Sequence, residues 1–411
     1  MSEDPQAGGR DEPFGPGFDL SQLMQAMQSF LTSEGPVNWE VAHQMGGVVA
    51  LTDPETGEQV EPGWNAADGD RIVELARLAQ SHVAESTGLV AVHTVPIRVI
   101  GRREWTAATL RELAPVIEAL AVALRGPIDD ADTSPDELRA PPNMLTPFMG
   151  GADFPDILSA LAPVLLGAQA GSMAGALAHY ALGRLDQSLP LDGEPEIAFV
   201  LANVDEFTRA WSLEQDDVYL SLALRETVRA AQRSLLWVRS GLVDRAVAFV
   251  SAYRPDAAAI DERFAGLDLG DPESLQEQLG DPAALLGMMR TPEQVALLDE
   301  LQRFVAVIEG YTDTVTASIG AKLIASHGMV DEALRRRRVE RGQAGMFAEQ
   351  MLGLELNREL FERGQQFSAG VLERAGLDGL NRLWSGPEML PTPAELDAPG
   401  LWLARIDLDQ S

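Results

Sequence analysis

The chain has 411 residues, long enough for two or three domains, and carries 63 acidic against 31 basic side chains, a net charge of -32 at pH 7. An anionic excess of this size repels nucleic acid and anionic lipid, so we expect no nucleic acid and no membrane as partners. The absence of cysteine excludes disulfides, a thiol nucleophile and cysteine-based metal sites. The sequence after Met1 lacks the apolar core of a signal peptide, so we expect a cytoplasmic protein.

Composition divides the chain into four parts. Residues 1–35 are rich in Gly, Pro, Asp and Gln, which predicts a disordered acidic tail. Residues 36–125 mix helical and β patterns. Residues 126–155 are a Pro- and Asp-rich connection, either a domain boundary or a long loop. Residues 156–411 predict a helical domain.

The region before the connection predicts two helices and a strand. Apolar residues at helical spacing indicate a helix over 70–86. Alternating Val and Ile residues predict a strand over 93–100. Thr106 has the side chain of an N-cap residue, so we expect it to start the next helix, over 107–124.

The segment 157–182 contains no Asp, Glu, Lys or Arg and is long enough to cross a bilayer. Its many Gly and Ala residues and its Pro163 make it only weakly hydrophobic, and it lacks the basic flank of a membrane anchor. Gly167, Gly171 and Gly175 recur every four residues and so share one helical face, where another backbone can approach closely. These features favour a buried central helix over a membrane span.

The rest of the chain has mostly helical patterns. A short apolar run predicts a strand over 197–204, with Asp205 as a cap for the segment after it. The next helix is expected over 216–240, with a stop at Gly241. Further helices are expected over 243–253, 273–279, 292–325, 329–338, 344–352 and 355–374. The fold class is therefore mainly α with a small β component.

Short motifs occur in a fixed order along most of the chain. They are Gly35-Pro36-Val37-Asn38-Trp39, Ala202-Asn203-Val204, Arg225-Glu-Thr-Val-Arg229, Glu309-Gly310-Tyr311, Trp384-Ser385-Gly386-Pro387 and Pro399-Gly400-Leu401-Trp402. In this order they resemble the zincin-like hydrolases of actinobacteria, a family described as zinc-dependent metalloproteases. The resemblance implies a zincin-like metallopeptidase fold, in a member whose metal-binding motif is degenerate.

In that family, the helix after the Asn-Val strand carries His-Glu-x-x-His, and a Glu in Glu-Gly-Tyr is the third ligand. Two imidazoles and a carboxylate hold zinc, which acidifies a water, while the Glu between the histidines takes the proton. The resemblance places this base at Glu226, the third ligand at Glu309 and a carboxylate that orients a ligand at Asp313. The two histidine positions are Arg225 and Arg229.

Arg225 and Arg229 cannot bind zinc, because a guanidinium has five donors, no acceptor and a pKa too high to lose its proton. Four residues apart on a helix, they share one face. If the family geometry holds, they meet Glu309, with Glu226 and Asp313 nearby, and we predict a salt-bridged cluster in the family's metal cleft. The alternative is a solvated basic stripe along the helix.

The chain offers no obvious substitute ligands. Its histidines are too far apart in sequence to form a pair on one helix or strand: His43, His82, His93, His179 and His327. We therefore expect no metal and no cofactor, although the family uses zinc. Some relatives are associated with deazaflavin cofactor synthesis, but no nucleotide-binding glycine motif supports that role here.

The run Arg335–Arg338 stands out in so acidic a chain. Four adjacent arginines on a helix spread around it, and Asp331, Glu332 and Glu340 are close enough in sequence to pair with some of them. Internal pairing is the favoured interpretation over a site for an anion or a partner.

Two functions stay open. One is a catalytically inactive pseudoenzyme that keeps the zincin fold and acts as a scaffold or binding protein for an unidentified protein or peptide partner. The other is an active zinc-dependent metalloprotease or hydrolase with a ligand set that the sequence does not reveal. The sequence alone leaves undecided whether the chain is an enzyme.

Overall fold

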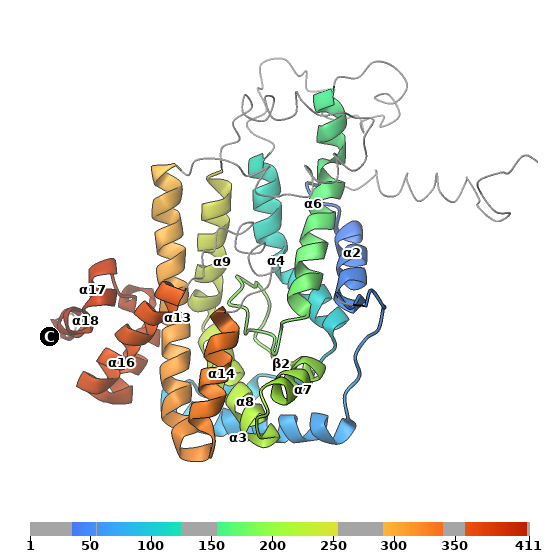
Figure 1. Ribbon diagram of the computed structural model, residues 1–411. Coiled ribbons are helices and arrows are strands. Elements are labelled where there is room, and N and C mark those ends of the chain that lie inside the picture. The colour runs from blue at the N-terminus through green and yellow to red at the C-terminus, as the bar shows by residue number, and fades with distance from the viewer. Residues whose placement is uncertain (1–34, 55, 125–153, 254–290, 340–357, 409–411) are drawn as a thin grey trace, which may run out of the picture.

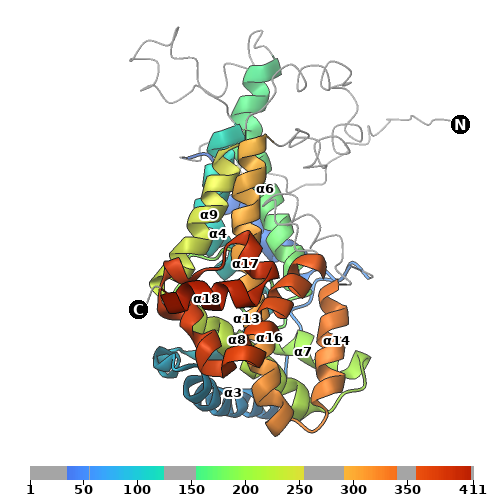
Figure 2. The same ribbon diagram turned by 90° about the vertical axis from the view of Figure 1, so that its left-hand side faces the viewer.

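In the computed structural model, an upright group of long helices stands beside a smaller set of C-terminal helices (Figures 1 and 2). The structure describes residues 35–54, 56–124, 154–253, 291–339 and 358–408. These residues confirm the mainly α fold class with a small β component.

The elements carry the labels of Figure 1. The first part of the chain forms α2 (Trp39–Leu51), α3 (Ala66–Thr87), the 3-10 helix η1 (Val90–Thr94), β1 (Ile97–Val99) and α4 (Arg102–Leu124). The middle forms α6 (Phe154–Ala178), β2 (Ile197–Phe199), α7 (Leu201–Ala210), α8 (Gln215–Arg233) and α9 (Leu236–Ser251). The last part forms α13 (Pro292–Leu323), α14 (His327–Val339), α16 (Arg358–Asn381), the 3-10 helices η2 (Arg382–Ser385) and η3 (Pro387–Met389), α17 (Pro393–Asp397) and α18 (Pro399–Leu408).

The two predicted strands exist and pair with each other. They run parallel, with Ile97 opposite Ile197 and Val99 opposite Phe199. Both are shorter than expected, because the first four residues of the 93–100 pattern lie in or just after η1 and α7 begins at Leu201. Since parallel strands need a long crossover, this pairing brings segments from two distant parts of the chain together.

Three expected helix signals were wrong. Thr106 does not cap α4 but lies inside it, where its hydroxyl donates to the Arg102 carbonyl at 2.8 Å. Asp205 lies inside α7, and Gly241 lies inside α9. Such residues favour helix ends only weakly, and the packing of an apolar helix face overrides that preference.

The glycine face of α6 meets α2, as the four-residue spacing predicts. A Cβ at Gly167 would lie 2.2 Å from the Asn38 carbonyl oxygen, and one at Gly171 would lie 2.2 Å from that of Ala42. The two helices run side by side, and α4 packs against both (Figure 1). Within the described ranges, no helix is long and apolar enough to span a membrane.

The helix α8 lies at the centre, packed against α3, α9, α13 and α14. Every residue from Val218 to Arg233 is buried. The single helix expected over 216–240 is in fact two helices, since α8 ends at Arg233 and α9 begins at Leu236. A helix enclosed on all sides must pair any charge that it carries.

The other expected helices have separate outcomes. Those over 292–325 and 329–338 are confirmed as α13 and α14, within two residues at each end. The helix expected over 355–374 is confirmed as α16, which continues past a kink at Gly376 to Asn381. The tail before residue 35, the connection up to residue 153 and the helices expected over 273–279 and 344–352 lie outside the described residues.

Candidate functional site

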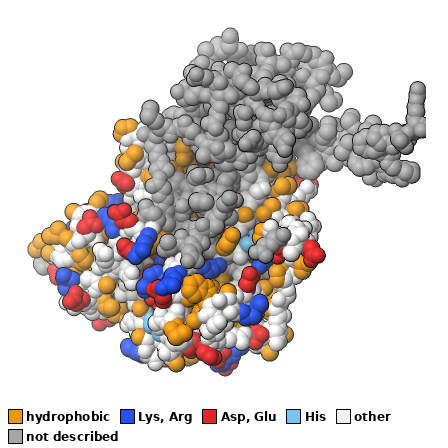
Figure 3. All heavy atoms as spheres, in the orientation of Figure 1, with side chains coloured by type: hydrophobic (Ala, Val, Ile, Leu, Met, Phe, Trp, Pro, Cys, Tyr) orange, Lys and Arg blue, Asp and Glu red, His pale blue; other side chains and the backbone are white. Residues whose placement is uncertain are grey.

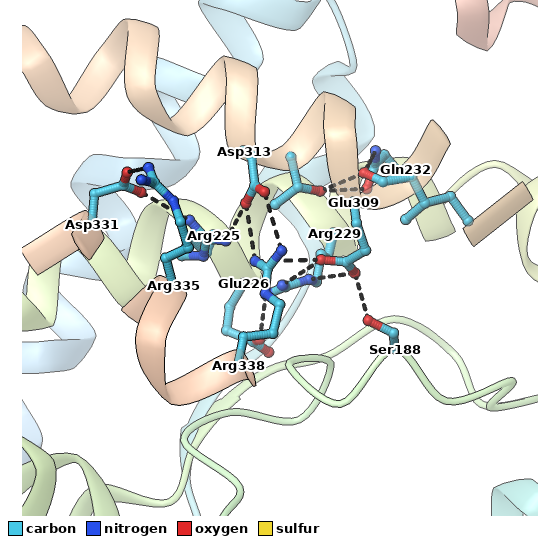
Figure 4. A network of polar contacts seen from close by, with 12 residues as sticks. Ser188, Arg225, Glu226, Arg229, Gln232, Glu309, Asp313, Asp331, Arg335 and Arg338 are labelled. Carbon is cyan, nitrogen blue, oxygen red and sulfur yellow. Dashed lines mark hydrogen bonds and ion pairs between the residues drawn. The ribbon is translucent and has the colours of Figure 1, made fainter. Parts of the chain in front are cut away.

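Arg225 and Arg229 extend from one face of α8 toward α13 and α14 (Figure 4). Their residues are only 5% and 4% exposed. This burial excludes the solvated stripe. Both guanidinium groups must then find partners inside the protein.

Arg229 holds Glu309 of α13 through two hydrogen bonds. Its Nη2 donates to Oε2 at 2.8 Å and its Nε to Oε1 at 3.2 Å. The Ser188 hydroxyl donates to the same carboxylate at 2.9 Å. Burial alone would raise the pKa of Glu309, but Arg229 and Arg338 outweigh it and hold the pKa below its usual value. Glu309 is thus an ionised carboxylate at neutral pH.

Arg225 pairs with Asp313, which lies one turn further along α13. Arg338 of α14 donates to the same carboxylate through two hydrogen bonds of 3.0 and 3.1 Å. Burial opposes the charge of Asp313, but Arg338 and Arg225 reverse that effect and hold its pKa well below the usual range. Arg225 Nη1 also lies 3.7 Å from Asp331 of α14. The arginines therefore join three helices.

Glu226 faces the loop that leads from α6 to β2. Its Oε2 accepts a hydrogen bond from the Leu185 amide at 2.9 Å, and its Oε1 lies 3.5 Å from Arg229 Nη1. A Cβ at Gly183 would lie 2.4 Å from the Glu226 carboxyl carbon, so only glycine leaves room for this contact. Burial raises the pKa of Glu226 to about 7 against the pull of Arg229, and nearby Asp186 adds to the rise.

The same loop is anchored by a third arginine of α8. Arg233 donates to the carbonyl oxygens of Leu189 at 2.7 Å and Leu191 at 3.5 Å. Burial lowers the pKa of Arg233 to about 10, which leaves the guanidinium protonated at neutral pH. With the contacts of Ser188 and Leu185, the charged row of α8 and α13 fixes the loop over residues 185–191.

The structure brings all five sequence-predicted site residues into one buried network. Figure 4 shows Arg225, Glu226 and Arg229 on α8 facing Glu309 and Asp313 on α13. The dashed contacts in that view include the ion pairs and hydrogen bonds given above, together with those of Gln232 and of Arg335 with Asp331.

Sequence reasoning missed Arg338 and Ser188. Arg338 comes after Val330 and Leu334 at four-residue steps, so it continues the buried face of α14, and this spacing could have identified it. Ser188 lies in a loop with a positive φ of 54°, for which the sequence gives no periodic signal. The predicted pairing of the arginine run is found for Arg335 with Asp331 at 2.6 Å; Glu340 lies outside the described residues.

The donor set does not fit zinc. Arg225 and Arg229 have no lone pair to give, and Arg229 and Ser188 already hold Glu309, the remaining ligand position. In the part of the chain that the structure describes, no group of three or more His, Asp or Glu side chains is arranged to hold a metal ion. His179 instead contacts Arg102 Nη1 at 3.0 Å and the Val49 carbonyl at 2.9 Å.

A solved structure shares the fold of this chain. A crystal structure from Chloroflexus aurantiacus, described as a "putative hydrolase with a novel fold", is 22% identical, with a TM-score of 0.57 over 90% of this chain and 99% of that one. A likeness at this identity shows the fold alone. A search of curated proteins finds no match. The profile of the family described as Zincin-like metallopeptidase matches residues 37–403, so the chain belongs to that family.

Proposed function

We propose that this chain is a catalytically inactive member of its family, a pseudoenzyme whose metal site is replaced by buried ion pairs. It acts as a scaffold or as a binding protein for a protein or peptide. The observation that carries the proposal is the pairing of Arg229 with Glu309, the family's third ligand, through hydrogen bonds of 2.8 and 3.2 Å.

The electrostatics of the cluster support this proposal. Arg225, Arg229 and Arg338 bring three fixed positive charges to the place where the family binds a divalent cation. A cation placed among them would be repelled, and it would find no neutral nitrogen ligand. Displacing the arginines would strand Glu309 and Asp313 as buried charges, which is strongly unfavourable.

The position of Glu226 supports it as well. A pKa of about 7 suits a general base. However, the residue is only 1% exposed, and its oxygens face the Leu185 amide and Arg229. A base must reach the proton that it removes, directly or through one water. Enclosed in this way, Glu226 serves to fix the loop.

Metal content tests the proposal directly. The wild-type protein, purified without a His tag, is expected to contain far less than one zinc per chain by elemental analysis. Stoichiometric zinc that a chelator removes together with a peptidase or hydrolase activity would overturn the proposal. That result would favour the alternative, an active zinc-dependent hydrolase with a different ligand set.

A gain-of-binding variant tests the assignment of positions. Arg225→His with Arg229→His places two imidazoles four residues apart facing Glu309, so micromolar or tighter zinc binding is expected by calorimetry. The matched control is Asp70→His with Glu74→His, an exposed pair at the same spacing on α3 and away from Glu309. Equal affinity in the two variants would show that Glu309 takes no part.

A further inference from the structure

A cavity of about 310 Å³ lies beside the buried network, between α13, α14 and α16. Asp313 and Arg338 form the wall that it shares with the network. Arg335 and Arg336 of α14 and Arg358 of α16 line the rest of its charged surface. A volume of this size accommodates a small ligand.

The cavity has an excess of positive charge. Four guanidinium groups face three carboxylates, those of Asp313, Glu332 and Glu362. The chain as a whole has the opposite balance, with a net charge of -32. Figure 3 shows Lys and Arg side chains gathered over the C-terminal end of α14. A local reversal of charge in so acidic a protein points to an anion.

Arg336 and Arg358 are each paired with a carboxylate, but these ion pairs are exposed, so a ligand can compete for the arginines. Arg336 Nε lies 2.7 Å from Glu332, with 61% of its side chain exposed. Arg358 Nε forms an ion pair with Glu362, and 74% of the Arg358 side chain is exposed. Such exposed surface pairs contribute little to stability, whereas an oxyanion that bridges two guanidinium groups gains several charge-assisted hydrogen bonds. A ligand can therefore displace these carboxylates.

The inner wall is fixed and partly apolar. Arg338 donates two hydrogen bonds to Asp313, and its guanidinium carbon lies 4.7 Å from the centre of the Phe361 ring. Phe361 is only 8% exposed, and the Gln365 side chain lies one helical turn further along α16 in the lining. The cavity thus combines exposed charged groups with an inner wall where Arg338 lies over the Phe361 ring.

We propose that this cavity binds the oxyanion group of a small ligand, a phosphate or a carboxylate. Arg336 and Arg358 hold the oxygens, and Phe361 supports the body of the ligand. The net negative charge of the protein does not prevent this, because distant charges are screened over about 8 Å at physiological ionic strength. The site goes beyond the proposed function and does not depend on it, since it involves neither metal nor hydrolysis.

Calorimetric titration of the full chain with inorganic phosphate and, separately, with succinate tests the proposal. Saturable binding of at least one is expected, and the stronger of the two identifies the class of anion. Arg336→Ala and Arg358→Ala should each weaken binding roughly tenfold, because each removes a charge-assisted contact. Both side chains are mostly exposed, so thermal melting of both variants should match the wild type.

The control variant is Arg374→Ala, which removes one positive charge from α16 outside the cavity. It should bind phosphate or succinate as the wild type does. No saturable binding at millimolar ligand, or equal weakening by Arg374→Ala and Arg336→Ala, would overturn the proposal. Finding zinc in the wild-type protein would overturn the proposed function and leave this result unaffected.

Discussion

The buried arginines of α8 are each held by an ion pair with a carboxylate of α13, and each pair has its own consequence for stability. Arg229 reaches Glu309, and Arg225 reaches Asp313, from positions that are buried in the protein. Paired buried charges stabilise a fold little in themselves, but removing one partner leaves the other without compensation. Replacing any single residue of the network is therefore expected to destabilise the fold.

Replacing Glu309 with Ala should lower the free energy of unfolding by about 3–5 kcal/mol, because Arg229 then keeps a buried charge without the carboxylate to which it donates two hydrogen bonds. Urea denaturation measures the loss. The control is Glu74→Ala, which breaks an exposed pair with Arg71 at 2.8 Å and should change stability very little. Similar small losses in both variants would contradict the buried pairing.

Glu226 gives the protein a pH dependence of known sign. Its pKa is raised from 4.5 to about 7, so its stabilising contribution is fully present below about pH 4.5 and is lost as the pH rises through 7. Glu226→Gln cannot ionise, so its stability relative to the wild type should increase between pH 5 and pH 8, by on the order of 3 kcal/mol at most. Thermal melting across this range measures the difference.

Asp313 provides a control of opposite sign. Its pKa is held well below the usual range, so its contribution is present above the pKa of the unfolded chain and is lost as the pH falls. Asp313→Asn should therefore destabilise the protein more at pH 7 than at pH 3. A difference between Glu226→Gln and the wild type that does not change with pH would show that Glu226 is not buried as described.

The site residues that share one short motif could be predicted from the sequence, whereas their distant partners could not. Arg225, Glu226 and Arg229 share one helical motif, so their common position was readable from spacing. The partners Glu309 and Asp313 were placed only by resemblance to the family, since they lie some 80 residues away along the chain. Arg338 belongs to a run for which the sequence predicts pairing with nearby acids of the same helix, whereas its partner Asp313 lies on α13 and is distant in sequence.

At the scale of elements, close contact between helices depends on glycine. Gly171→Ala should destabilise the protein, because the new Cβ would lie 2.2 Å from the Ala42 carbonyl oxygen and would push α2 and α6 apart. The control is Gly47→Ala on α2, where no atom lies within 4 Å of the new Cβ and helix propensity favours Ala by up to about 1 kcal/mol. Melting temperatures should thus change in opposite directions, and equal changes would exclude the close approach.

Helices were easier to predict than their ends. Long apolar periodicity identified α13 and α16, and four-residue spacing identified the contact face of α6. The break between α8 and α9 was missed, because both helices continue one apolar pattern and the signal at Gly241 lies in the middle of α9. Ends are set by tertiary contacts, such as those that fix the loop against Arg233, which a local pattern does not contain.

For the whole molecule, net charge is the dominant electrostatic feature. With a charge of -32, self-repulsion destabilises the folded state, and raising salt from about 10 mM to about 100 mM shortens the screening length from about 30 Å to about 10 Å. The melting temperature should therefore rise with sodium chloride, because the buried pairs are little screened. A falling melting temperature would show that exposed ion pairs such as Arg71–Glu74 dominate instead.

Arg338 belongs both to the interior and to a surface that solutes can reach. Its guanidinium donates to Asp313 in the network and also lines the cavity, so a solute bound in the cavity would lie beside a side chain on which the interior network depends. Thermodynamic linkage is reciprocal. If a bound solute stabilises the native state, then a change that weakens the interior network lowers the affinity for that solute by the same free energy. The concentration of a small anion that binds in the cavity would then set how stable the folded state is.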